Sequence, residues 1–224
     1  KHRVDIEETT KDDDLSDIMA GSFLLEKESR DRFNDEADLY VNAVETPLGT
    51  MNIISPDSSQ LLVEDRAYEG FRQNQYKDPL KNYIAEYFMK TGTALKAIDR
   101  GNYEEYKKYL DVDSFIDFII FQEVSKNIDG NMKVSIFFNK DKGEKLKIGP
   151  LWDFDIAYGN ADYNNGDAAS YGYTTTDFMV ITSSWFSYLA RDPWFYDRLC
   201  ERYEELRNGL FKEFPTKIDE TAVY

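Results

Sequence analysis

The stretch that most constrains the fold of this chain runs from residue 121 to residue 160. Residues 133–139 are β-branched and aromatic, and residues 145–149 run back after an Asp-Lys-Gly turn at 141–143 that accepts a positive φ. This pattern is typical of a β-hairpin. The sequence therefore predicts two antiparallel strands whose outer ends lie side by side.

An acidic motif lies at each of these outer ends. Asn-Ile-Asp-Gly at 127–130 precedes the first strand, and Trp-Asp-Phe-Asp at 152–155 follows the second. The hairpin is therefore expected to bring Asp129 and Asp153 within reach of one shared ligand. Two carboxylates in this arrangement favour a hard cation, or a proton acceptor beside one.

The segment before Asp129 is predicted to be a buried helix, because apolar side chains cover most of its faces between residues 115 and 124. Asp113 is positioned to cap its N-terminus. Gly130 permits a left-handed turn where the helix stops. Asp129 then projects from a loop that a buried helix anchors.

Composition narrows the chemistry that this loop can support. The single cysteine, Cys200, excludes an intrachain disulfide and a multi-cysteine metal site, and its helical, apolar neighbours predict a buried thiol. The single histidine, His2, argues against a Ser-His-Asp triad or a histidine-rich zinc site. The formal charge of −16 argues against nucleic acid or an anionic membrane as the main partner. No apolar run is long enough to span a membrane.

The rest of the chain predicts an α+β fold. Residues 1–60 are expected to form a small antiparallel sheet, and residues 61–224 a mainly helical lobe with the 121–160 hairpin inserted. The expected strands lie at 21–28, 38–46 and 51–55, and the expected helices at 76–88, 102–110, 184–191 and 193–206. Glu26 could face the cleft, but a solvent-facing position is favoured.

The order of helix, Asn-x-Asp-Gly, hairpin and Gly-Pro-x-Trp-Asp-Phe-Asp resembles the CotH kinase family, the spore coat protein H-like proteins. The resemblance runs from the Lys-His-Arg opening to the region of Arg207 and covers most of the chain. Because the family is similar to protein kinases, it implies that Asp129 acts like the aspartate of a kinase catalytic loop. It also implies that Asp153 acts like the metal-binding aspartate of the kinase Asp-Phe-Gly motif.

The resemblance implies further roles around these two aspartates. Asp155 is a plausible second metal ligand or loop stabiliser, and Trp152 and Phe154 are expected to pack beneath the loop. Asn127 is an alternative for holding the loop, because an amide beside Asp129 can fix its rotamer through hydrogen bonds. In protein kinases an Asn five positions after the catalytic Asp also binds metal. That position is valine here, so Ser135 or Asn131 would have to substitute if the loop register shifts.

The implied function is an atypical Ser/Thr protein kinase with ATP as co-substrate and Mg²⁺ as cofactor, acting on an exported or cell-envelope protein outside the cytoplasm. The family's N-terminal lobe would lie before Lys1, so we expect this chain to be mainly the C-terminal lobe and inactive alone. Hydroxyls at Ser170 and at 174–176, in a polar loop that spans residues 161–178, are potential phosphoacceptors.

Two other functions remain open at this point. The first is a kinase-like surface module that binds or adheres to protein or glycan through exposed aromatic side chains without catalysis. The second is a two-carboxylate glycosidase that uses Asp129 and Asp153. Mg²⁺-dependent nucleotide binding separates the kinase from the first alternative.

Overall fold

The structure is a computed structural model, and it describes residues 22–34, 39, 42–56, 77–160 and 177–222. The predictions for the hydroxyls of Ser170 and residues 174–176 fall outside these ranges. Among the described residues, no helix is long and apolar enough to cross a membrane.

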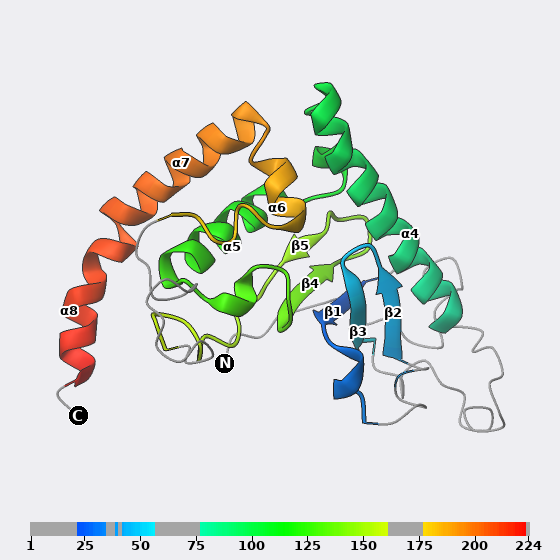
Figure 1. The fold of residues 1–224 in the computed structure, drawn as a ribbon, viewed down its shortest axis with the longest axis horizontal. Coiled ribbons are helices and arrows are strands. Elements are labelled where there is room, and N and C mark those ends of the chain that lie inside the picture. Colours follow the sequence, from blue (N-terminus) through cyan, green and yellow to red (C-terminus); the bar gives the residue numbers. More distant parts are fainter. Residues whose placement is uncertain (1–21, 35–38, 40–41, 57–76, 161–176, 223–224) are drawn as a thin grey trace.

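A five-stranded antiparallel sheet lies beside the helices, with the strand order β2-β3-β1-β4-β5 (Figure 1). The three predicted N-terminal strands and the predicted hairpin are all present. Their bounds are β1 (Phe23–Lys27), β2 (Ala43–Thr46), β3 (Gly49–Ser55), β4 (Ile136–Lys140) and β5 (Lys147–Ile148).

The hairpin β4–β5 is part of this sheet and is not a separate insertion in the helical region. β1 pairs with β4 along its whole length, and Glu26 lies opposite Phe137. Strands from the predicted β region at 1–60 and strands from the predicted helical lobe at 61–224 therefore belong to one sheet. This pairing places β1 next to the loops at the outer end of the hairpin.

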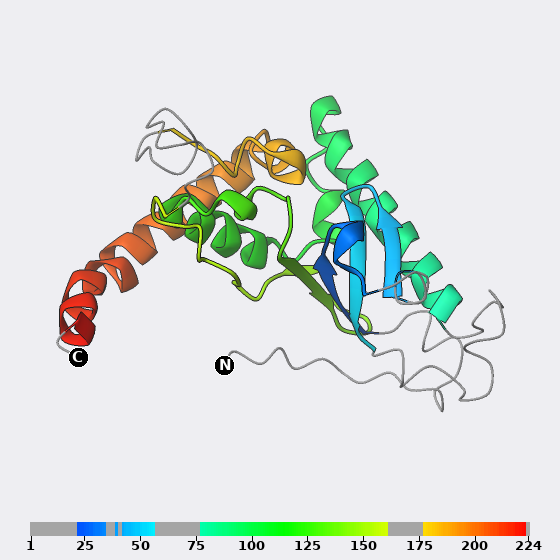
Figure 2. The same ribbon diagram turned by 60° about the horizontal axis from the view of Figure 1, so that its bottom comes forward.

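The helices complete the α+β fold that the sequence predicts. In Figure 2, α4 covers one face of the sheet, α5 lies at the centre, and α7 and α8 extend away from the sheet. The helices are α4 (Lys77–Lys96), α5 (Val112–Ser125), α6 (Ser184–Leu189), α7 (Pro193–Asn208) and α8 (Leu210–Ala222), with short 3₁₀ turns η1 (Arg30–Arg32), η2 (Ala97–Arg100), η3 (Tyr106–Lys108) and η4 (Ile128–Gly130). The second short helix predicted at 102–110 is reduced to η3.

The core forms where α4 packs on the sheet. The Phe88 ring meets the Phe138 ring edge-on, with centroids 5.4 Å apart. Phe23 and Leu25 are fully buried on β1, and each such side chain stabilises the fold by about 1.5–3 kcal/mol. Because successive strand residues point to opposite faces, Glu26 lies on the other face of the sheet, with Phe137.

Aspartates cap the N-termini of α5 and α7. At α7 the prediction is confirmed: the Asp192 side chain accepts a hydrogen bond from Trp194 N at 2.9 Å, and Pro193 follows it. At α5 the predicted cap is wrong. Asp111, not Asp113, accepts from Ser114 N at 3.0 Å, because the helix begins one residue after Asp111.

Cys200 is exposed on α7, so the prediction of a buried thiol is wrong. The buried face of α7 consists of Phe195, Leu199 and Leu206. Cys200 follows Leu199 by one position, about 100° further around the helix, and this rotation turns its side chain off the buried face.

Candidate active site at the C-terminal end of helix α5

A left-handed residue ends α5 and begins the loop that carries Asp129, as predicted, but this residue is Lys126 and not Gly130. Lys126 ends α5 with φ 52°, whereas Gly130 is required for another reason. A Cβ atom on Gly130 would lie 2.3 Å from Gln122 Oε1, and Gln122 is itself buried. Close packing against α5, and not a left-handed backbone, therefore explains the glycine of the Asn-Ile-Asp-Gly motif.

Asn127 joins the two acidic loops. Its side chain is 1% exposed, and its Nδ2 donates a hydrogen bond to the backbone oxygen of Asp153 at 3.1 Å. A second link forms where Tyr158 N donates to Ser125 O. The structure thus brings the loops of Asp129 and Asp153 together at the end of α5.

Asp153 is held in an unusual backbone conformation. Its φ is 58°, and Ser135 also has a positive φ of 56°. Left-handed non-glycine residues are uncommon and tend to gather at functional sites. Ser135 Oγ donates a hydrogen bond to Asp153 Oδ2 at 3.1 Å. The carboxylate is therefore oriented by the start of β4 while it remains exposed.

Asp129 is half-buried beside charges of both signs. Burial raises the pKa of its carboxyl above the ordinary value, and the nearby Asp153 and Asp155 act in the same direction, whereas Lys133 and Arg32 oppose the rise. No hydrogen bond from another described residue reaches this carboxylate. Asp129 is therefore free to accept a proton from a bound molecule.

Of three comparisons with known proteins, the one with family models gave a match. The family model described as CotH kinase protein matches residues 19–222. The chain belongs to the CotH kinase family. Searches among curated proteins and among solved structures gave no significant match. The predicted family is thus confirmed, although the matched range begins after the Lys-His-Arg opening. Membership indicates a kinase-like function.

One acidic-loop residue of this CotH family chain, Trp152, lies differently from the prediction. Trp152 was expected to pack beneath the loop, but it is 58% exposed. Its ring meets Phe137 edge-on on the open face of the sheet, with centroids 6.1 Å apart. Asp155 is exposed as well, and Asn160 Nδ2 donates to its backbone oxygen at 2.6 Å.

Glu26, Arg32 and Lys133 belong to the electrostatic surroundings of the acidic loops. The sequence did not point to Arg32 or Lys133, and for Glu26 it favoured solvent over the cleft. Glu26 is half-buried, so its expected exposure to solvent is wrong. Burial raises its pKa, Glu28 and Asp153 add to the rise, and Arg32 opposes it. The alternation of β1 predicts that Glu26 lies opposite the core-facing Leu25. Only the pairing of β1 with β4, which the sequence does not reveal, shows that this is the side of the acidic loops.

The residues present fit a magnesium ion that a nucleotide helps to hold. The side-chain oxygens Asn127 Oδ1 and Asn131 Oδ1 are buried and have no hydrogen-bond partner in the described part of the chain. Within that same part, no group of three or more His, Cys, Asp or Glu side chains could hold a metal on its own. Mg²⁺ is usually bound by one or two carboxylates together with substrate phosphates and waters. Asp153, with Asp155 or an orphaned amide oxygen, meets that requirement.

Proposed function

We propose that this CotH family protein transfers the γ-phosphate of ATP to a Ser or Thr hydroxyl of another protein. The observation that carries the proposal is the convergence of Asp129 and Asp153 at the end of α5, where Asn127 and Ser135 hold the second loop by two hydrogen bonds at 3.1 Å. Phosphoryl transfer requires alignment and charge neutralisation more than covalent chemistry. The oriented carboxylate of Asp153, the neighbouring carboxylate of Asp129 and the nearby cations would provide both.

Asp129 acts on the incoming hydroxyl. The hydroxyl oxygen forms a bond to the γ-phosphorus, the bond from phosphorus to the β–γ bridging oxygen breaks, and ADP leaves with that electron pair. The hydroxyl proton passes to the Asp129 carboxylate. The raised pKa of Asp129 supports this role, because a general base works best when its pKa lies closer to the working pH.

Asp153 is the residue that would hold Mg²⁺, with Asp155 or Asn131 as the second protein ligand. When bound, the ion supplies positive charge that neutralises the phosphates. Lys133 and Arg32 lie close enough to lower the pKa of Asp129. The same two cations would attract a polyphosphate to a chain whose net charge is −16.

The test is transfer of labelled γ-phosphate from ATP by the intact protein. We expect Asp129→Ala and Asp153→Ala to abolish transfer while the proteins stay folded. Asp113→Ala is the matched control, because Asp113 lies near the opposite, N-terminal end of α5 and its side chain is 80% exposed. Transfer that persists in both site variants would contradict the proposal, as would a loss in the Asp113 variant.

We place the acceptor protein outside the cytoplasm, in the secreted or envelope fraction, as the family resemblance implies. Fractionation of cells that express the intact protein tests this location. If the protein stays in the cytoplasmic fraction, the acceptor must be a cytoplasmic protein.

A second function, a surface module that binds without catalysis, draws support from large aromatic side chains on the surface. Trp152, Tyr158 and Phe178 are all exposed, and exposed apolar groups of this size often mark interaction sites. ATP binding without transfer, or no binding at all, would favour this module. A glycosidase role is not favoured, since the family match already accounts for Asp129 and Asp153.

A further inference from the structure

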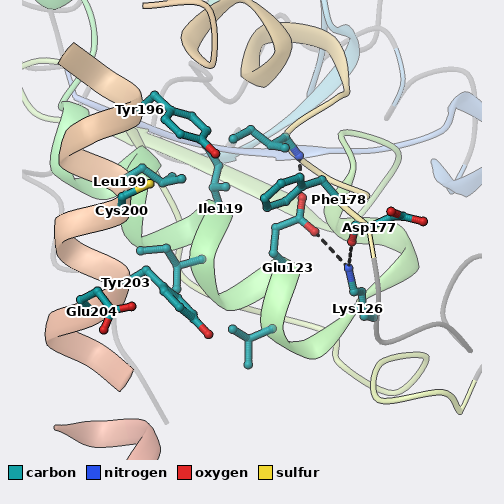
Figure 3. A pocket seen from close by; sticks show the side chains of 13 residues that line it. Ile119, Glu123, Lys126, Asp177, Phe178, Tyr196, Leu199, Cys200, Tyr203 and Glu204 are labelled. Atoms are coloured by element: carbon teal, nitrogen blue, oxygen red, sulfur yellow. Dashed lines mark hydrogen bonds and ion pairs between the residues drawn. The ribbon is translucent and has the colours of Figure 1, made fainter. Parts of the chain in front are cut away.

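A pocket lies between α5, α7 and the segment at 177–181 (Figure 3). Its volume is about 640 Å³. Pockets that bind small organic molecules range from about 300 to 1,000 Å³. The space therefore suits a ligand of ordinary small-molecule size.

The walls of this pocket are mainly apolar, and they include the planar faces of aromatic rings. α5 contributes aliphatic side chains that include Ile119 and Val124, and the opposite wall carries the rings of Tyr196 and Tyr203 on α7. Phe178 lies at the third side and is 57% exposed. Tyr196 and Tyr203 lie seven residues apart, so both face the same side of the helix. Aromatic rings on two sides favour a planar ligand.

The charged groups that line the pocket are already matched within the chain. Glu123 accepts hydrogen bonds from the backbone nitrogens of Val180 at 2.7 Å and Ile181 at 2.8 Å, and also from Met179. Lys126 Nζ donates to the backbone oxygen of Asp177 and pairs with Glu123. Neither charge is left to bind a charged ligand.

Glu204 and Asp177, the two acidic groups at the rim of the pocket, also offer no free charge to a ligand. Glu204 forms an ion pair with Arg207 at 3.0 Å. In Figure 3 the Asp177 carboxylate points away from the pocket. A charged ligand would lose its hydration here without a free counter-charge to replace it. The pocket therefore favours an uncharged molecule.

Polar groups that remain free for a ligand are the phenolic hydroxyls of Tyr196 and Tyr203. Neither makes a hydrogen bond to another described residue, and Figure 3 shows the Tyr196 hydroxyl turned toward Ile119 across the pocket. Such hydroxyls donate and accept hydrogen bonds at the edge of an apolar site. The geometry points to this pocket as a binding site for an uncharged, planar aromatic molecule that hydrogen-bonds these two hydroxyls.

Cys200 provides a reporter, because it lines the pocket and is the single cysteine of the chain. The experiment measures the rate at which iodoacetamide alkylates Cys200, by intact-mass spectrometry, in the presence of three matched probes. 1-Naphthol is neutral, 1-naphthoate is an anion, and 1-naphthylmethylammonium is a cation of nearly the same shape. For ligands this small we expect millimolar affinity.

We expect 1-naphthol to slow alkylation in a saturable way, by roughly threefold at twice its dissociation constant. The two charged probes should have little effect at the same concentration. Tyr203→Ala should abolish the protection, whereas Tyr103→Ala should keep it, because Tyr103 is a similarly exposed tyrosine outside the pocket. Saturation-transfer NMR of 1-naphthol on the same variants gives a reading that does not depend on the thiol.

Three results would overturn the proposal. Equal protection by all three probes would show that charge plays no part in selection. Protection that persists in Tyr203→Ala would place the probe elsewhere. A Cys200 that fails to react without any probe would show that the pocket is already covered, by another part of this chain or by a second copy. Asp153→Ala should leave 1-naphthol binding intact, so the outcome is independent of the proposed phosphotransfer.

Discussion

The aspartates at the N-terminal ends of α5 and α7 contrast with those at the C-terminal end of α5. Asp192 is 1% exposed, and both of its carboxylate oxygens are used: Trp194 N donates to one at 2.9 Å and Tyr106 Oη to the other at 2.7 Å. Asp129 is half-buried, yet no described residue donates a hydrogen bond to its carboxylate. Asp153 receives one side-chain hydrogen bond, from Ser135.

The difference separates the structural aspartates from those with a proposed function: the first have donors for all their acceptor positions, and the second do not. A buried carboxylate with matched donors stabilises the fold, and its loss leaves other buried groups unpaired. A partly buried carboxylate with unused acceptor positions raises the free energy of the folded state. Such a carboxylate is a candidate for binding a ligand that fills those positions. The predictions below test whether the two classes respond in opposite ways.

The largest effect is expected on catalysis. Asp129→Asn keeps the shape of the side chain but removes the proton acceptor, so kcat for phosphate transfer should fall by about 10²- to 10⁴-fold. The KM for ATP should change little, because the proposed role of Asp129 is at the acceptor hydroxyl and not at the nucleotide. Steady-state kinetics of the intact protein measure both. A loss confined to the KM for ATP would show that Asp129 binds nucleotide instead.

Asp192→Ala tests the structural aspartates, whose carboxylate oxygens already have hydrogen-bond donors. The variant loses the α7 cap, worth about 1 kcal/mol, and leaves the buried Tyr106 hydroxyl unpaired at a cost of about 1–3 kcal/mol. The free energy of unfolding should fall by their sum, and urea denaturation measures it.

Tyr106→Phe is the matched control for Asp192→Ala, because it removes the hydroxyl and spares the cap. It leaves one buried Asp192 oxygen unpaired, so it should cost about 1–3 kcal/mol without the contribution of the cap. Equal losses in the two variants would mean that the cap contributes nothing. In both variants the folded fraction should retain wild-type transfer activity.

A smaller effect is expected from Gly130→Ala, which inserts a methyl group against Gln122. Overpacking of this kind costs about 1–3 kcal/mol, or displaces the Asp129 loop. Gln122→Ala in the same chain should restore stability and transfer, because it removes the atoms that clash. If the double variant is no better than Gly130→Ala alone, backbone conformation and not packing explains the glycine.

The smallest expected effect is a gain in the stability of Asp129→Asn over the wild type, and this gain should depend on pH. Because the folded-state pKa of Asp129 is raised above the ordinary value of 3.8, the wild type loses stability as pH rises from that value through the folded-state pKa. Asp129→Asn does not titrate, so in metal-free buffer it should be slightly more stable at pH 7, within about 0.5 kcal/mol.

That gain should vanish at a pH below 3.8, where Asp129 is protonated in both the folded and the unfolded states. Thermal unfolding across this range measures it. A variant that is less stable than the wild type at pH 7 would place Asp129 among the structural aspartates.

The sequence was sufficient to predict the strands, the hairpin and the proximity of the two acidic loops, because period, turn residues and hairpin geometry are local. It was also sufficient to identify the α7 cap and the family. It could not show that β1 pairs with β4, because strand order is a tertiary property, and so Glu26 was assigned to solvent. Trp152 and Cys200 were misplaced for a related reason: apolar character in a sequence does not specify which face of an element the fold covers.

The most direct test of the central claim is Mg²⁺-dependent ATP binding by the intact protein, measured by titration calorimetry for the wild type, Asp153→Asn and Asp192→Asn. The account predicts that wild-type binding requires Mg²⁺, that Asp153→Asn loses this dependence together with most of the affinity, and that folded Asp192→Asn binds like the wild type. ATP binding that ignores Mg²⁺, or that survives in Asp153→Asn, would contradict the assignment of Asp153 as the metal-binding residue of a kinase-like site.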